Sequence, residues 1–82
     1  MKTYTNLNQN EISVLKAIAL SSEGNDGDFT YFEDVIEELE ICLTKEQVKG
    51  YFSQLEKKNY IAIYDGQICA AGEVDCLTDY EF

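Results

Sequence analysis

Residues 43–71, LTKEQVKGYFSQLEKKNYIAIYDGQICAA, decide the fold of this chain. Thr44 and Gln47 have the spacing of a capping box, in which each side chain bonds the other residue's backbone amide. The apolar residues after this box recur at helical spacing, which predicts a helix over 44–58. Asn59 suits the left-handed position just past a helix end. The stretch therefore predicts a capped amphipathic helix that leads directly into extended chain.

The extended chain after Asn59 predicts a β-hairpin. Residues 60–64 alternate between apolar and polar positions, and Asp65-Gly66 is a preferred pair for a type I′ turn. Such a turn places Ile63 opposite Ile68 in the second strand, residues 67–71. All the hairpin isoleucines then share one face, which we expect to close the core.

Two further helices are expected before this stretch. Asn8 and Glu11 form a second capping-box pattern, which predicts a helix over 8–21. A polar loop over 22–28 and a short strand at Phe29-Thr30 follow. Thr30 with Glu33 has the same capping pattern and predicts a helix over 30–40. We expect the following residues to be buried: Ile12, Leu15, Val35, Leu39, Val48, Phe52, Leu55, Ile61, Ile63 and Ile68.

Composition limits the functions that the chain can have. Its 82 residues suit one domain, and sixteen acidic residues against six lysines give a formal charge of -10. There is no histidine, no glycine-rich phosphate loop and no nucleophile beside a base, so we expect neither an enzyme nor a cofactor. The loop at 25–28 only weakly resembles a calcium site, because it lacks the glycine position and the closing glutamate of an EF-hand, and we expect no metal.

The compartment is suggested by what the sequence lacks. No apolar run reaches the length of a membrane span, and residues 1–6 contain no apolar signal core. The three cysteines form no CxxC pair, which suits reduced thiols. We therefore expect a cytoplasmic protein.

The pattern resembles the winged helix-turn-helix superfamily, with MarR-type features. The residues that carry the resemblance are 11–18, 48–55, 57–61 and the Asp65-Gly66 turn. It implies an α+β, mainly α fold: a three-helix bundle with a C-terminal β-hairpin wing. We expect one domain over 1–82, with a core region at 8–71. Residues 72–82 form an acidic C-terminal tail with spaced apolar residues, either frayed or packed on the body or on a second subunit.

The resemblance implies that double-stranded DNA is bound by the exposed face of helix 44–58 and by the wing. The candidate contacts on this reading are Lys45, Gln47, Lys49, Ser53, Lys57 and Gln67, with Asp65 at the wing tip. Residues 44–60 hold four of the six lysines, which favours this hypothesis. The acidic wing tip, the absence of arginine and the absence of the MarR dimerisation helices depart from the family pattern. Gly50 is interpreted either as room for a close partner or as a tolerated weak position. A small DNA-binding transcriptional regulator, acting as a homodimer, is the first hypothesis.

The alternative is an acidic protein-binding or DNA-mimicking module. Helix 30–40 carries a run of acids that is either a solvated surface or a docking strip for a basic protein. These acids are Glu33, Asp34, Glu37, Glu38 and Glu40.

Overall fold

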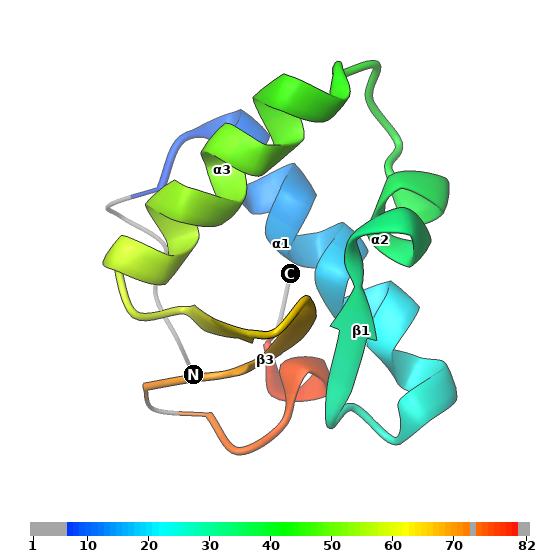
Figure 1. Ribbon diagram of the computed structural model, residues 1–82, viewed down its shortest axis with the longest axis vertical. Coiled ribbons are helices and arrows are strands. Elements are labelled where there is room, and N and C mark those ends of the chain that lie inside the picture. Colours follow the sequence, from blue (N-terminus) through cyan, green and yellow to red (C-terminus); the bar gives the residue numbers. More distant parts are fainter. Residues whose placement is uncertain (1–6, 73, 81–82) are drawn as a thin grey trace.

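The computed structural model describes residues 7–72 and 74–80 of the chain (Figure 1). The described part contains the helices α1 (Gln9–Ser22), α2 (Phe32–Glu38) and α3 (Lys45–Lys57). The strands are β1 (Phe29–Tyr31), β2 (Ile61–Tyr64) and β3 (Gln67–Ala70), and short 3-10 turns lie at η1 (Glu23–Asn25) and η2 (Leu77–Asp79). The strands form one antiparallel sheet in the order β1-β3-β2. The predicted class, α+β and mainly α, is confirmed.

Helix α1 is the centre of the molecule, because α2, α3, β1 and η2 all pack against it. In Figure 1, α3 and α2 lie on either side of α1, with the sheet beyond the C-terminal end of α3. Of the three predicted capping boxes, those at α1 and α3 are present. They satisfy amides that the first turn of a helix otherwise leaves unpaired.

The core agrees with the expected list at seven of its ten positions. The seven buried residues are Leu15, Val35, Val48, Phe52, Leu55, Ile61 and Ile68. Ile12, Leu39 and Ile63 are instead half-buried and pack against the edge of the core. Leu39 comes after the end of α2, and Ile63 lies near the hairpin tip. Neither position is enclosed on all sides.

The hairpin has the predicted register, with Ile63 opposite Ile68 and Ile61 opposite Ala70. Asp65 and Gly66 have φ of 53° and 88°, the positive values that a type I′ turn requires. Asn59, at φ 67°, takes the left-handed position that ends α3. On the outer edge of β2, the amide of Ile63 donates to the Glu56 carboxylate at 3.3 Å.

The predicted capping box at Thr30 and Glu33 is wrong, and α2 is shorter than the expected range 30–40. Thr30 lies in β1 opposite Ile68, is fully buried, and shares a hydrogen bond of 2.7 Å with the Ser21 hydroxyl. Pairing with β3 keeps the backbone extended through Tyr31, which is the N-cap residue and makes no side-chain cap. Glu40 consequently lies beyond α2, where it pairs with Lys16 at 3.6 Å.

The described part of the acidic tail packs on the body of the domain. Leu77 is fully buried, and its amide donates to the Gly27 carbonyl at 2.8 Å. Gly27 has φ of 78°, and a side chain there would meet Thr78. Tyr80 packs on Tyr60 and donates its hydroxyl hydrogen to the Tyr60 carbonyl. The core thus extends beyond the expected range 8–71. Glu73 and residues 81–82 of this segment lie outside the described residues.

Leu77→Ala tests whether this segment is part of the folded unit. Because Leu77 is fully buried, the substitution should lower the free energy of unfolding by about 2–5 kcal/mol in urea denaturation. Leu20→Ala is the control, since Leu20 is 36% exposed and should lose less than about 1 kcal/mol. Equal small losses in the two variants would contradict the packed position of the segment.

Candidate nucleic-acid interface

The exposed face of α3 carries a stripe of three lysines and a serine. Lys45, Lys49, Ser53 and Lys57 follow one another at intervals of four residues, and all four are exposed. Residues four apart on a helix lie on the same side of it, so these side chains form one row. We call this row the lysine stripe. These four candidate contacts are therefore on the surface of the helix.

The stripe is held in place by the buried side of the same helix. Val48, Phe52 and Leu55 are buried in the core. The Phe52 ring meets Phe32 of α2 edge to face, with 5.5 Å between centroids. Lys49 Nζ lies 5.5 Å from the centroid of the Phe32 ring, a cation–π contact that ties the stripe to the start of α2.

Two further features of α3 affect what it can bind. Gln47 is exposed as predicted, but its Oε1 accepts the Thr44 amide at 2.8 Å, so its side-chain nitrogen is the group left to face a partner. Gly50 borders a shallow hollow with Gln47, Tyr51 and Gln54. A side chain at Gly50 would meet nothing within 4 Å, so packing within the described residues does not require glycine there.

The β2–β3 hairpin and β1 present an aromatic surface with an acid at the turn. On the outer face of the sheet, Gln67 lies between Tyr31 of β1 and Tyr64 of β2 in register. Gln67 Nε2 donates to the Tyr31 hydroxyl at 3.2 Å, and Tyr64 is 66% exposed. Asp65 is exposed at the turn. Neither tyrosine is among the contacts predicted from the sequence. The alternation in residues 60–64 was the available signal for Tyr64, whereas Tyr31 had been assigned to a helix.

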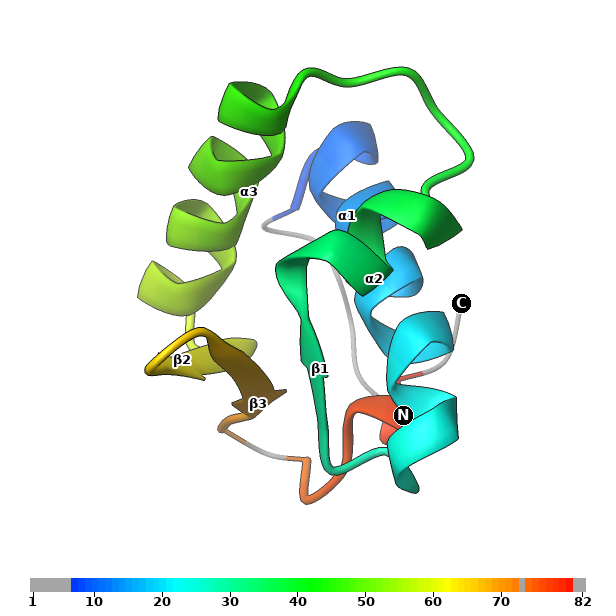
Figure 2. The ribbon, with the colours of Figure 1, turned by 45° about the vertical axis from the view of Figure 1, so that its right-hand side comes forward.

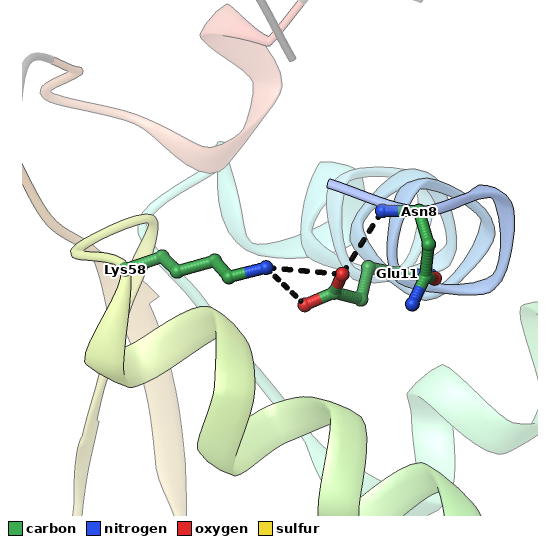
Figure 3. Close-up of polar contacts among 3 residues, drawn as sticks. All are labelled: Asn8, Glu11 and Lys58. Carbon is green, nitrogen blue, oxygen red and sulfur yellow. Dashed lines mark hydrogen bonds and ion pairs between the residues drawn. The ribbon is translucent and has the colours of Figure 1, made fainter. Parts of the chain in front are cut away.

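The fourth lysine of the region, Lys58, does not belong to the stripe. Its Nζ lies 2.9 Å and 3.1 Å from the two carboxylate oxygens of Glu11, which is 3% exposed (Figure 3). The same carboxylate accepts the Asn8 amide of the capping box at 2.9 Å. The pair links the start of α1 to the end of α3. The positive charge that α3 presents to a partner therefore comes from three lysines.

The surroundings of Glu11 change its acidity. Burial by itself raises the pKa of this carboxyl, but the hydrogen bond from Asn8 and the ammonium of Lys58 outweigh it and hold the pKa below 4.5. Glu11 therefore stays ionised in the folded protein at neutral pH. The ionised carboxylate accepts hydrogen bonds from both of its partners, the Asn8 amide and the Lys58 ammonium.

The acids proposed as a docking strip are split between α2 and the loop behind it. Glu33, Asp34, Glu37 and Glu38 are exposed on α2, and none of these four forms an ion pair with a described residue. In Figure 2, α3 forms the left margin of the molecule and α2 lies on its inner side. The stripe and these acids lie on different helices, α3 and α2. The two helices touch where Lys49 reaches the ring of Phe32, the residue before Glu33.

The described part of the chain offers no metal cluster and no disulfide. No group of three or more potential metal ligands occurs there, and its cysteines, Cys42, Cys69 and Cys76, are unpaired. None of its helices combines the length and apolar character of a membrane span. A scan against protein-family models finds no match for the chain, and searches of curated proteins and of solved structures likewise return none.

Glu11→Gln tests the linkage between α1 and α3. Glutamine keeps an acceptor for Asn8 but removes the charge that binds Lys58, so the variant should lose about 2 kcal/mol of unfolding free energy at pH 7. Because the folded-state pKa is lowered, this contribution is present above pH 4.5 and disappears as the pH falls through the folded-state pKa. Urea denaturation of the parent and the variant should show a smaller difference in unfolding free energy at about pH 3 than at pH 7.

The control for this experiment is Glu46→Gln, at an exposed glutamate of α3. It should change the unfolding free energy by less than about 0.5 kcal/mol at either pH. A Glu11→Gln difference of the same size at both pH values would show that the charge of Glu11 does not stabilise the fold.

Proposed function

We propose that this chain is a small winged-helix DNA-binding protein that uses α3 as its recognition helix. The observation that carries the proposal is the lysine stripe, which places three cations and a hydroxyl in one row on the exposed side of α3. The helix follows α2 through a connection at 39–44 and leads directly into the β2–β3 hairpin. Helix-turn-helix proteins insert their second helix into the major groove in such an arrangement.

The overall acidity does not prevent this function. Charges farther than a Debye length, about 8 Å at physiological ionic strength, are largely screened from a bound phosphate. The α2 acids lie on a different helix from the stripe, although Lys49 contacts Phe32 at the start of that helix (Figure 2). The -10 charge still opposes the approach of DNA at long range. We therefore expect binding to begin slowly and to depend on close contacts.

The lysine stripe is better suited to contacting the phosphate backbone of DNA than to recognising bases. Lysine binds phosphate as a point charge, whereas the bidentate reading of guanine is mainly the work of arginine, which this chain lacks. Gln54 and Ser53, also exposed on α3, are the groups suited to base edges. One chain offers few contacts, so we expect two copies to bind two half-sites.

Replacing Lys49 and Lys57 by Glu should abolish DNA binding. The measurement is a band-shift with the DNA upstream of the chain's own coding region, at about 50 mM and 150 mM salt. The matched control replaces Lys2 and Lys16 by Glu. It has the same net charge and, among the described residues, removes the exposed Lys16–Glu40 pair, whose loss costs little stability. The Lys2/Lys16 control should retain DNA binding, and both variants should have melting temperatures close to that of the parent protein. Retained binding in the Lys49/Lys57 variant would rule out α3 as the contact surface.

The salt dependence of binding should report how many lysines take part. Counterion release predicts a slope of log affinity against log salt of about -3 for one bound chain and about -5 for a pair. Fluorescence anisotropy of a labelled duplex over a series of salt concentrations measures this slope. If the parent protein binds neither the upstream DNA nor a random duplex pool at low salt, the DNA-binding proposal is wrong.

A further inference from the structure

An apolar cleft lies where α2 leads into α3. It has a volume of about 400 Å³. Its lining residues are Ile36, Leu39, Ile41, Cys42, Leu43, Thr44 and Gln47. Figure 2 shows the connection between the two helices as a long arc that crosses the top of the molecule. The cleft is therefore built by the end of α2, this arc and the first turn of α3.

The apolar side chains of the cleft are only partly enclosed. Ile36, Leu39 and Leu43 pack against the core from one side and are half-buried. Ile41 is half-buried and Cys42 is exposed. Four aliphatic side chains that share one open surface favour contact with another apolar surface, because covering them removes their area from water.

The charges beside the cleft determine which occupant it suits. Glu37 and Glu46 are exposed, and each is next in sequence to a lining residue. Glu40 also adjoins the lining, but it pairs with Lys16 at 3.6 Å. One lysine, Lys45, is also next in sequence to a lining residue, Thr44. A second copy of this chain would bring another net charge of -10 toward these acids, and DNA would bring phosphates. Both are repelled, whereas a basic segment is attracted.

We propose that this cleft binds a Lys- or Arg-rich amphipathic helix of a partner protein. Apolar side chains of the helix enter the cleft, and its basic side chains meet the acids at the rim. This is the helix-in-groove mode of recognition, in which anchors recur at helical spacing along one face of the bound segment. The proposed site goes beyond the DNA-binding function and uses neither Lys49 nor Lys57.

The probe is a fluorescein-labelled peptide of leucine and lysine, about eighteen residues long, with leucines at helical spacing. Fluorescence anisotropy measures its affinity for the intact chain. A scrambled peptide of the same composition has the same charge but no apolar face. We expect the scrambled peptide to bind at least about tenfold more weakly. Equal affinities would mean that the -10 field alone attracts the peptide, which would overturn the proposal.

Ile41→Asp tests the apolar contact against the charge. It adds a negative charge, which by itself strengthens attraction of the peptide, yet we expect affinity to fall about tenfold or more. Gly24→Asp adds the same charge at an exposed position where a side chain meets nothing within 4 Å, and it should bind as well as the parent. Equal affinities in the two variants would exclude Ile41 and the cleft.

A measurement on the parent protein guards against a variant that fails to fold. Amide chemical shifts recorded during titration with the peptide should change at residues 36–47. Changes confined to the outward face of α3, or spread evenly over all acidic positions, would overturn the proposal. So would a dimer in sedimentation analysis that Ile41→Asp dissociates, because the occupant would then be a second copy.

Discussion

The Glu11 carboxylate is the contact on which the arrangement of the helices depends. It completes the capping box of α1 through the Asn8 amide and holds Lys58 at the end of α3. Removing such a carboxylate from water is costly unless each acceptor is matched by a donor, and here both oxygens are. Immediately after Lys58, Asn59 turns the chain out of the helix and toward β2. The direction of α3 and the start of the β2–β3 hairpin are therefore determined at the same point, by a bond to the first turn of α1.

The parts of the fold that follow local rules could be predicted from the sequence. Thr44 with Gln47, and Asn8 with Glu11, meet the capping-box rule within four residues, and both boxes form. The hairpin register could be predicted from the Asp65-Gly66 turn and from the alternation of side chains between the two faces of a strand. A slip by one residue would turn every isoleucine outward. The residues of the lysine stripe were candidate contacts that the family resemblance implied, and they form one row because a spacing of four places residues on one side of a helix.

The parts that depend on distant residues could not be predicted. Thr30 met the capping pattern, yet pairing with Ile68 of β3 keeps it in a strand. Lys58 suited a helix C-terminus by local rules, and nothing near it in sequence indicated a partner 47 residues away. Leu77 and Tyr80 stood in an acidic stretch whose place on the body is set by Gly27 and Tyr60. The apolar cleft is also non-local, because its shape depends on how the arc between α2 and α3 crosses the core.

The hydrogen bond between the Ile63 amide and Glu56 has a consequence for how the protein behaves when it is concentrated. The order β1-β3-β2 leaves β2 at an edge of the sheet, where an apolar strand readily recruits a strand from another molecule and starts a fibril. Here the outward amide of Ile63 is occupied, and the group that occupies it carries a negative charge. An incoming strand loses a donor and meets a carboxylate that repels its carbonyl oxygens. Glu56 of α3 thereby opposes growth of the sheet between molecules at its β2 edge.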